Sequence, residues 1–146
     1  MKSRIYYNRQ AVLVVRHYNG FKDKISPHLM YHINTSDDLV SVNFMLASPR
    51  LYNEIIGIIT VSIYEDGNYI HGLSISEKYR KRGYGNALVL MCEHFLSFCR
   101  RDFDNELNVE LCSLKDWHQQ WYMRHGYVKV GTQCKGKYVK LRKQIK

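Results

Sequence analysis

Hydrophobic and polar residues alternate in several short stretches of the chain, which is the pattern of β-strands with one buried face. Leu39–Leu46 alternates in this way, and Ile55–Tyr64 is a longer stretch rich in isoleucine. Glu65–Asn68 separates it from a further stretch at Tyr69–Ser76, and its glycine and asparagine favour a tight turn. The pattern therefore predicts three strands, of which the last two form a hairpin.

The second half of the chain carries one long helical pattern and several shorter elements. Between Tyr84 and Arg100, apolar residues recur at spacings of three and four, which predicts a helix with one buried stripe. The stripe consists of Leu88, Met91, Cys92, Phe95 and Cys99. The pattern then predicts a strand at Leu107–Ser113 and a short helix at Asp116–His125 that is ended by Gly126. Two closing strands are expected at Tyr127–Val130 and Lys137–Leu141, around a loop at 131–136.

The first third of the chain has a less regular pattern. Ala11–Arg16 is short and β-branched, which predicts a strand, and Gly20–Ile33 predicts a helix or an irregular turn. Asn34–Asp38 consists of loop-forming polar residues. The order of strands, helix, strand, helix and two strands in 146 residues predicts a single domain over 1–146 with a mixed α/β sheet.

The charge is strongly positive, with a formal net charge of +9 at pH 7. This predicts an affinity for anions, whether nucleic acid, an acidic protein surface or a phosphorylated cofactor. Seven of the cations lie in the last eighteen residues with no acid among them, namely Lys129, Lys135, Lys137, Lys140, Arg142, Lys143 and Lys146. These residues form either a solvated basic tail or a binding surface.

The cysteines and the apolar runs point to a cytoplasmic protein. No two of the four cysteines form a Cys-x-x-Cys pair or have zinc-finger spacing to a histidine, so we expect buried, reduced thiols and no metal. The longest apolar run, Ile55–Ile63, is shorter than the roughly 20 residues that cross a bilayer. Near the N-terminus the apolar run Ala11–Val15 is brief and ends at Arg16, so we expect neither a signal peptide nor a membrane partner.

Three cations and two glycines stand at the start of the long helix, in the segment Arg80–Gly85. A helix start presents backbone N–H groups and a partial positive charge, and glycines let an anion approach them closely. The segment predicts a phosphate-bearing ligand, most simply a pyrophosphate. The third glycine of a dinucleotide fingerprint and the Gly-Lys-Ser/Thr of a Walker A loop are both missing. A basic surface turn that ends in a glycine cap is the alternative.

Three features in this order resemble the GNAT superfamily of acyl-CoA-dependent N-acyltransferases. Tyr79–Gly85 (YRKRGYG), after the strand at Leu73–Ile75, is similar to the family's Gln/Arg-x-x-Gly-x-Gly/Ala loop. Leu107–Ser113 resembles the strand that follows the helix, and Trp121–Tyr127 (WYMRHGY) resembles the family's aromatic-Tyr-x-x-x-Gly-Phe/Tyr signature. The resemblance extends over roughly Ile55–Val130. It implies a mostly antiparallel, twisted sheet that splays between the strands at 69–76 and 107–113 and is flanked by helices.

The resemblance also implies where acetyl-CoA would bind. The backbone amides of Arg82, Gly83, Tyr84, Gly85 and Asn86 would hold the pyrophosphate. The cationic side chains of Arg80, Lys81 and Arg82 in the same loop would assist them. The strand residues Leu73, Ser74 and Ile75 would pair with the pantetheine arm. Tyr122 would lie near the sulfur. Lys115 stands where the family often has an asparagine, so it would reach phosphate or face solvent.

The chemistry of amide formation assigns further roles. An amine with a pKa of about 10 must lose a proton before it attacks the thioester, and the resulting oxyanion can be stabilised by a strand N–H such as that of Leu73. Tyr122 can protonate the thiolate that leaves, or can be a buried core aromatic. The family's glutamate base aligns with Tyr69. His71, two residues further on, is then the candidate base, with Glu110, His118 or a water chain as alternatives and simple packing as its other role.

The leading function is therefore an acetyltransferase that moves an acetyl group from acetyl-CoA to a primary amine, on a protein, an RNA-linked group or a small molecule. The positive charge disfavours polycationic acceptors. The alternatives are a non-catalytic CoA-binding or nucleic-acid-binding module, with the mixture of Tyr138 and cations in the last strand as the nucleic-acid surface, and a subunit that docks through Trp117 and Trp121.

Overall fold

The computed structural model describes residues 4–17, 27–36, 39–49, 54–100, 107–113 and 116–145. In chain order the elements are α1 (Arg4–His17), β1 (His28–Thr35), β2 (Leu39–Ser48), β3 (Glu54–Tyr64), β4 (Asn68–Ile75), a 3₁₀ turn (Glu77–Tyr79), α2 (Tyr84–Arg100), β5 (Leu107–Ser113), α3 (Asp116–Arg124), β6 (Val128–Gln133) and β7 (Tyr138–Ile145). From β2 onward this order confirms the mixed α/β prediction.

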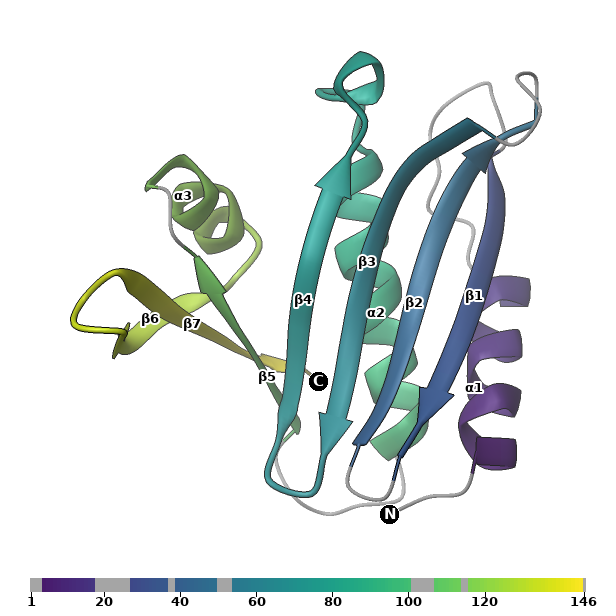
Figure 1. The fold of residues 1–146 in the computed structure, drawn as a ribbon, viewed down its shortest axis with the longest axis horizontal. Coiled ribbons are helices and arrows are strands. Elements are labelled where there is room, and N and C mark those ends of the chain that lie inside the picture. The colour runs from purple at the N-terminus through teal and green to yellow at the C-terminus, as the bar shows by residue number, and fades with distance from the viewer. Residues whose placement is uncertain are drawn as a thin grey trace.

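Seven strands form one sheet in the order β1-β2-β3-β4-β5-β7-β6. All neighbours are antiparallel except β4 and β5, which run parallel and share only two residue pairs, Asn68↔Val109 and Tyr69↔Glu110. Beyond these pairs the two strands diverge, as Figure 1 shows. The sheet therefore splays at the predicted place.

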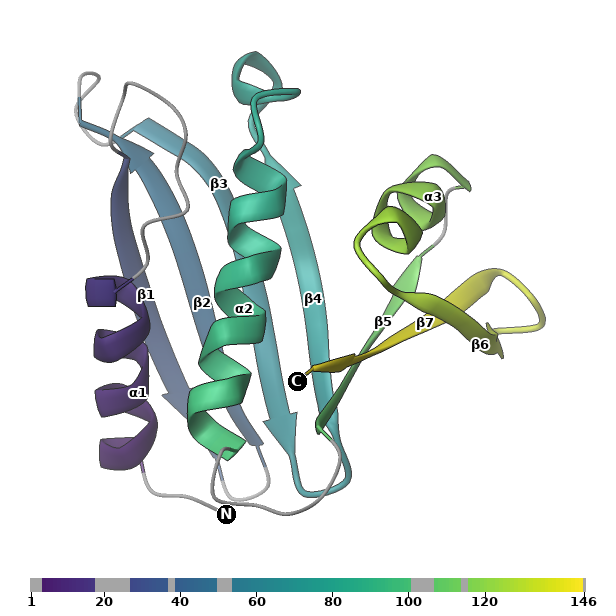
Figure 2. The same ribbon diagram turned by 180° about the vertical axis from the view of Figure 1, so that it is seen from behind.

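Helices α1 and α2 pack side by side against one face of β1–β4, and α3 lies beside the C-terminal strands (Figures 1 and 2). The predicted stripe of α2 is buried, with every member at most 1% exposed. Phe95 meets Phe44 of β2 edge to face at 5.6 Å. Each such side chain contributes about 1.5–3 kcal/mol to stability by leaving water. None of the described helices has both the length and the hydropathy needed to cross a membrane.

The strand predicted at Ala11–Arg16 is wrong, because these residues form the C-terminal half of α1. Tyr7, Ala11 and Val14 are spaced by four and three residues, and each is at most 2% exposed, so they form one buried helical face. The hydroxyl of Tyr6 donates to the carbonyl of Cys99 at the end of α2 (2.8 Å). Packing on α2 thus overrides the strand preference of the valines, as tertiary contacts often do.

The helix or irregular turn predicted for Gly20–Ile33 is wrong from His28 onward, where β1 begins, and residues 20–26 lie outside the described chain. Asn34 and Thr35, expected in a loop, belong to β1 as well. Leu29, Tyr31 and Ile33 alternate toward the helices, and Tyr31 pairs with Phe44 in the register of β2. Met30 on the outer face obscures this alternation in the sequence, because it makes three successive residues apolar.

The cysteine prediction is half right. Cys92 and Cys99 are buried in α2, whereas Cys112 and Cys134 are exposed, and all four are free thiols. Cys112 lies on the outward face of β5, opposite the buried residues Val109 and Leu111. In the C-terminal hairpin β6 and β7 are each longer than expected, and the turn between them is Cys134–Lys137.

Candidate functional site

The loop before α2 is built around a buried tyrosine. Tyr79 is 6% exposed, donates its hydroxyl to a carboxylate oxygen of Glu54 (3.2 Å), and meets the ring of Tyr84 edge to face at 6.1 Å. Arg80 donates from Nε to the carbonyl of Ile75 (3.0 Å), which ties the loop to the end of β4. The side chains of Arg80, Lys81 and Arg82 are all exposed. The loop therefore has a rigid interior and a cationic surface.

The start of α2 has the backbone geometry of an anion cradle. Gly83 has φ +89°, and no atom lies within 4 Å of the place where its side chain would be. The first helical hydrogen bond runs from the amide of Ala87 to the carbonyl of Gly83 (3.1 Å), so the preceding amides have no carbonyl partner within the helix. A side chain here would stand where a bound anion could approach these amides.

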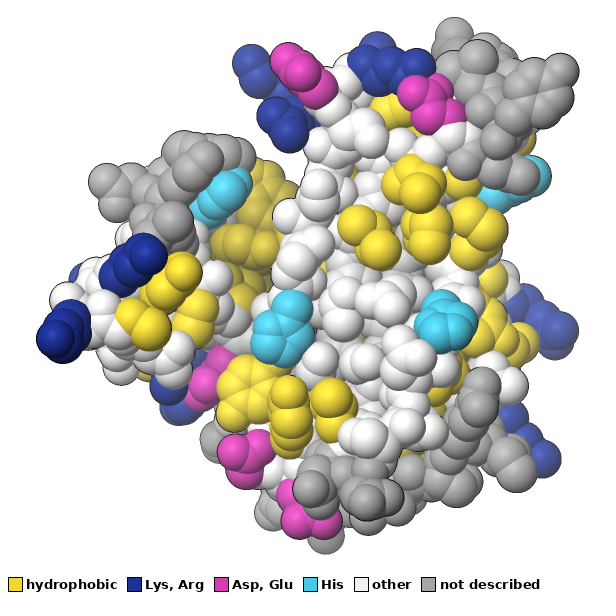
Figure 3. Space-filling model, in the orientation of Figure 1, with side chains coloured by type: hydrophobic (Ala, Val, Ile, Leu, Met, Phe, Trp, Pro, Cys, Tyr) yellow, Lys and Arg dark blue, Asp and Glu magenta, His cyan; other side chains and the backbone are white. Residues whose placement is uncertain are grey.

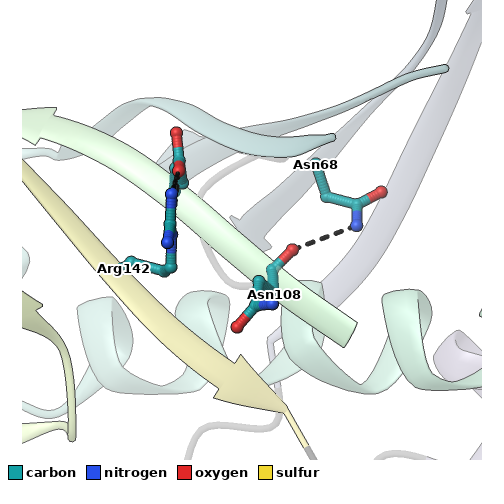
Figure 4. A network of polar contacts seen from close by, with 4 residues as sticks. Asn68, Asn108 and Arg142 are labelled. Carbon is teal, nitrogen blue, oxygen red and sulfur yellow. Dashed lines mark hydrogen bonds and ion pairs between the residues drawn. The ribbon is translucent and has the colours of Figure 1, made fainter. Parts of the chain in front are cut away.

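A cleft of about 1000 Å³ opens where β4 and β5 diverge. Strands β4 and β5 are held together at its closed end, where Asn68 donates from its amide to the carbonyl of Asn108 (3.1 Å; Figure 4). Nearby, the Nε of Arg142 on β7 donates to Glu110 on β5 (2.9 Å). Nearly all predicted site residues line the cleft, namely His71, Leu73, Ser74, Ile75, Arg80, Lys81, Gly83, Tyr84, Gly85, Asn86 and Tyr122. The structure thus gathers the predicted cofactor loop and the predicted acid around one space.

Arg82 is the one predicted cofactor residue that the structure describes away from the cleft. The guanidinium of Arg82 lies over the ring of Tyr79 (5.9 Å from its centroid) and does not line the cleft. Lys115 is outside the described residues, as is the side chain of Trp117. Trp121 is partly buried against the core and faces Gly85, where an added Cβ would lie 3.4 Å from the indole. An added Cβ would be in ordinary van der Waals contact there, so Trp121 packs α3 closely against the first turn of α2.

Tyr122 is held rigidly between other aromatic rings. It is 8% exposed, and Trp121 and Tyr127 meet it edge to face at 4.9 and 5.5 Å. Helix α3 ends at Arg124, one residue earlier than predicted, and is followed by a turn in which Gly126 has φ +94°. The amide of Tyr127 donates back to the carbonyl of Tyr122 (3.2 Å). Burial raises the pKa of the Tyr122 phenol well above its ordinary value, with a smaller effect of the Cys92 thiol. The hydroxyl therefore stays protonated.

All three candidate bases line the same cleft, on two sides of it. His71 on β4 stacks on Tyr69 (6.2 Å between centroids), and loss of solvent around the imidazole lowers the pKa of His71. Glu110 on β5 forms an ion pair with Arg142. His118 approaches from α3. His71 is therefore neutral at pH 7 and able to accept a proton.

Backbone geometry near His71 is irregular. His71 pairs with Thr60 and Ser74 pairs with Ile58, so Gly72 and Leu73 both lie opposite Ile59 in a β-bulge. Gly72 has φ +62°, which supplies the extra bend. Leu73 consequently has no partner in the regular register of β3. The bulge was not predicted from the sequence, although a glycine within an alternating strand is the usual sign of a bulge.

Several residues that line the cleft were not predicted from the sequence to belong to this site: Cys112, Gln133 and Lys140. Cys112 donates from its thiol to the side-chain oxygen of Gln133 (3.3 Å). The alternation along β5 places Cys112 on the face of Glu110, which is the signal that could have identified it. In the part of the chain that the structure describes, no three His, Cys, Asp or Glu side chains gather in a way that could hold a metal ion.

The basic C-terminal segment is partly neutralised by acids from other elements. Arg142 pairs with Glu110, and Lys143 donates to Glu93 of α2 (2.8 Å). Lys135 and Lys137 are exposed in the β6–β7 turn, next to Tyr138. Two of the cations in the proposed nucleic-acid surface therefore have structural partners.

Comparison with known proteins gives one family match. The model of the acetyltransferase (GNAT) domain matches residues 42–129. No curated protein sequence matches significantly.

Three similar solved structures share the fold. An acyl-CoA N-acyltransferase from Pseudomonas aeruginosa is 18% identical, with a TM-score of 0.57 over 70% of this chain and 67% of that one. PaiA N-acetyltransferase from Thermoplasma acidophilum, solved with coenzyme A, is 16% identical, with a TM-score of 0.55 over 73% and 61%. A chain of the KacTA–DNA complex is 14% identical, with a TM-score of 0.59 over 76% and 70%. The aligned region thus spans roughly two thirds of each of these proteins.

Proposed function

Because the chain belongs to the acetyltransferase (GNAT) domain family, whose model matches more than half of it, we propose that it transfers an acetyl group from acetyl-CoA to a primary amine. The observation that carries the proposal is that the start of α2 and Tyr122 of α3 line one cleft. A phosphate bound at the start of α2 and a thioester near Tyr122 would belong to one extended ligand. The coenzyme A bound to the PaiA structure is such a ligand.

The residues of the cleft fit this ligand. The open space at Gly83 admits a diphosphate to the amides of the first turn of α2, and the exposed cations of the loop supply charge. The pantetheine arm would run along Leu73–Ile75, where the divergence of β4 and β5 leaves the edge of β4 without a strand neighbour in the sheet. The amide of Leu73, in the bulge, would stabilise the oxyanion.

The proposed reaction assigns a role to two side chains that line the cleft. The amine nitrogen attacks the thioester carbonyl, a C–N bond forms, and the C–S bond breaks. His71 would accept the proton that the amine loses, directly or through water, and Tyr122 would donate a proton to the departing thiolate. Free coenzyme A and an N-acetyl product result.

We expect Gly83→Glu to weaken acetyl-CoA binding about 10–100-fold relative to Gly83→Gln. Both side chains strain the left-handed backbone of Gly83 equally and fill the same space. They differ by one negative charge, which would lie against the diphosphate. Isothermal titration calorimetry of the two variants isolates that charge. Equal affinities in folded proteins would show that no diphosphate binds at this helix start.

We expect kcat/KM to fall on the acid side of its pH profile as His71 becomes protonated, at a pH below 6.5. The sign follows from the lowered pKa of His71, since a base must be neutral and a lowered pKa extends the neutral form to more acidic pH. His71→Gln should remove this ionisation and leave that of the amine substrate. A profile with the same acid limb in both proteins would assign the base elsewhere.

A second candidate function is binding of single-stranded nucleic acid through the β6–β7 turn, favoured by exposed Lys135 and Lys137 beside Tyr138. The KacTA chain of similar fold was solved with DNA. The ion pairs of Arg142 and Lys143 weigh against this candidate. Oligonucleotide binding whose affinity falls steeply with salt, and falls less steeply in Lys135→Ala/Lys137→Ala, would favour it.

A further inference from the structure

One face of the four-stranded half of the sheet carries no described helix. Helices α1 and α2 cover the opposite face of β1–β4 (Figures 1 and 2), and the space-filling view in Figure 3 looks onto the open face. The connection between β1 and β2 spans only residues 36–38, so no helix is inserted there. With the exception of the buried Ser62, the polar side chains of this face are therefore not covered by any of the helices that the structure describes.

The strand registers align the side chains of the open face in rows across the four strands. One row consists of His32, Asn43, Thr60 and His71. The neighbouring row consists of Asn34, Ser41, Ser62 and Tyr69. Residues between them along the strands, such as Val42 and Val61, are fully buried on the helix side. All eight side chains of the two rows can form hydrogen bonds, and none is an acid, a lysine or an arginine.

Apolar groups border these rows. The row on the side of the α2 start contains Met30, Met45 and Ile58, and Tyr64 meets Tyr69 edge to face at 5.5 Å on the other side. Figure 3 shows histidine side chains on this face, uncharged polar surface between them, and hydrophobic side chains above and below. The open face is therefore a neutral, hydrogen-bonding band with apolar margins.

The band runs directly into the proposed catalytic cleft. Tyr69, His71 and Ser74 belong to the open face and also line the cleft. Strands lie about 4.8 Å apart, so a row across four strands extends roughly 14 Å from His71 to His32. A molecule that presents an amine beside His71 would lie over this band.

The chemistry of the band selects the kind of molecule. Its rows hold no cation to neutralise phosphates, which weighs against nucleic acid. The backbones of β2 and β3 are paired on both sides, so a peptide could not add to them as a strand. The Thr60 hydroxyl donates to the side-chain oxygen of Asn43, which occupies that acceptor and leaves the Asn43 amide N–H groups as donors. Closely spaced hydroxyls, amides and imidazoles beside an aromatic pair match a hydroxyl-rich ligand.

We propose that the row from His71 to His32 is the floor of the acceptor site, and that the acceptor is an amino sugar at the end of a short, otherwise uncharged oligosaccharide. This inference rests on the proposed acetyl transfer. Thr60 and Asn43 are its specificity-determining residues, because they lie at the centre of the row and present polar groups to the sugar hydroxyls. His71 lies at the amine, and His32 lies at the far end of the carrier.

The test is an NMR titration of the histidine ring signals, with the protein saturated with coenzyme A so that no transfer occurs. The probe is a chitotriose in which only the non-reducing glucosamine has a free amine and the other two sugars are N-acetylated. Both His71 and His32 should shift with one dissociation constant, and Thr60→Val should raise that constant about tenfold. Thr132→Val makes the same change at an exposed position on β6 and should leave it unaltered.

Other outcomes overturn the inference. A shift of His71 without His32 would mean that the carrier stays in the cleft, and equal shifts with an uncharged tripeptide amide would remove the preference for sugar. No shift of either ring, with coenzyme A bound, would refute the acceptor floor and leave acetyl transfer standing. Failure to bind coenzyme A at all would refute the proposed function itself.

Discussion

Replacing Tyr122 with phenylalanine should lower the rate of acetyl transfer by about 10²–10⁴, with the affinity for acetyl-CoA nearly unchanged. The variant removes one hydroxyl and keeps the ring that packs against Trp121 and Tyr127. Because the hydroxyl would act only on the departing thiolate, its loss should appear in kcat rather than in binding. The measurement is thiol release under single-turnover conditions, in which chemistry limits the rate.

The raised pKa of Tyr122 bears on this role. Burial disfavours the phenolate, so the hydroxyl keeps its proton at neutral pH and above. The same apolar surroundings disfavour a naked thiolate and make it a stronger base. The first effect keeps the proton on the phenol until the C–S bond begins to break, and the second then favours its transfer to the sulfur.

Two controls separate proton donation from packing. When the thioester is made from a more acidic thiol, its thiolate leaves without being protonated. The Tyr122→Phe variant should therefore lose much less activity with that thioester than with acetyl-CoA. Tyr127→Phe removes the hydroxyl of a neighbouring buried tyrosine that donates to Glu93 (3.1 Å), and it should affect stability rather than the chemical step. An unaltered single-turnover rate in Tyr122→Phe would mean that the thiolate takes its proton from water.

Elements with a strong local pattern were predictable from the sequence alone. The stripe of α2 repeats over about three turns, from Leu88 to Cys99, and the predicted helix bounds of Tyr84–Arg100 are those observed. Gly83 and Gly126 both have the positive φ that glycine permits, so their places at the start of α2 and after α3 could be predicted as well. These features depend only on residues close together in the chain.

Features that depend on distant residues could not be predicted in this way. The valines of α1 become helical because α2, about eighty residues further on, offers them a surface. Cys112 is exposed because β5 diverges from β4 and leaves the outward face of β5 open to the cleft. Lys143 has the appearance of a tail cation in the sequence, and its partner Glu93 lies fifty residues away. Local pattern carries no information about such pairings.

Lys143→Met should lower the free energy of unfolding by about 3 kcal/mol, because it leaves the Glu93 carboxylate buried without its cation. Glu93 is 7% exposed, and its two oxygens accept from the ammonium of Lys143 (2.8 Å) and the hydroxyl of Tyr127 (3.1 Å). The ammonium also lies 5.7 Å from the centre of the Tyr127 ring. Together these contacts attach β7 and the segment after α3 to α2.

The size of this effect can be tested by urea denaturation at neutral pH, with Lys129→Met as the control on an exposed cation of β6. The control should change stability by at most about 0.5 kcal/mol. Adding Glu93→Gln to Lys143→Met removes the stranded charge and should restore more than half of the loss. A fall below about 1 kcal/mol for Lys143→Met would show that the pair behaves like a surface salt bridge. Because Tyr127 contacts both Glu93 and Tyr122, a large loss would also mean that the ion pair supports the placement of the proposed proton donor.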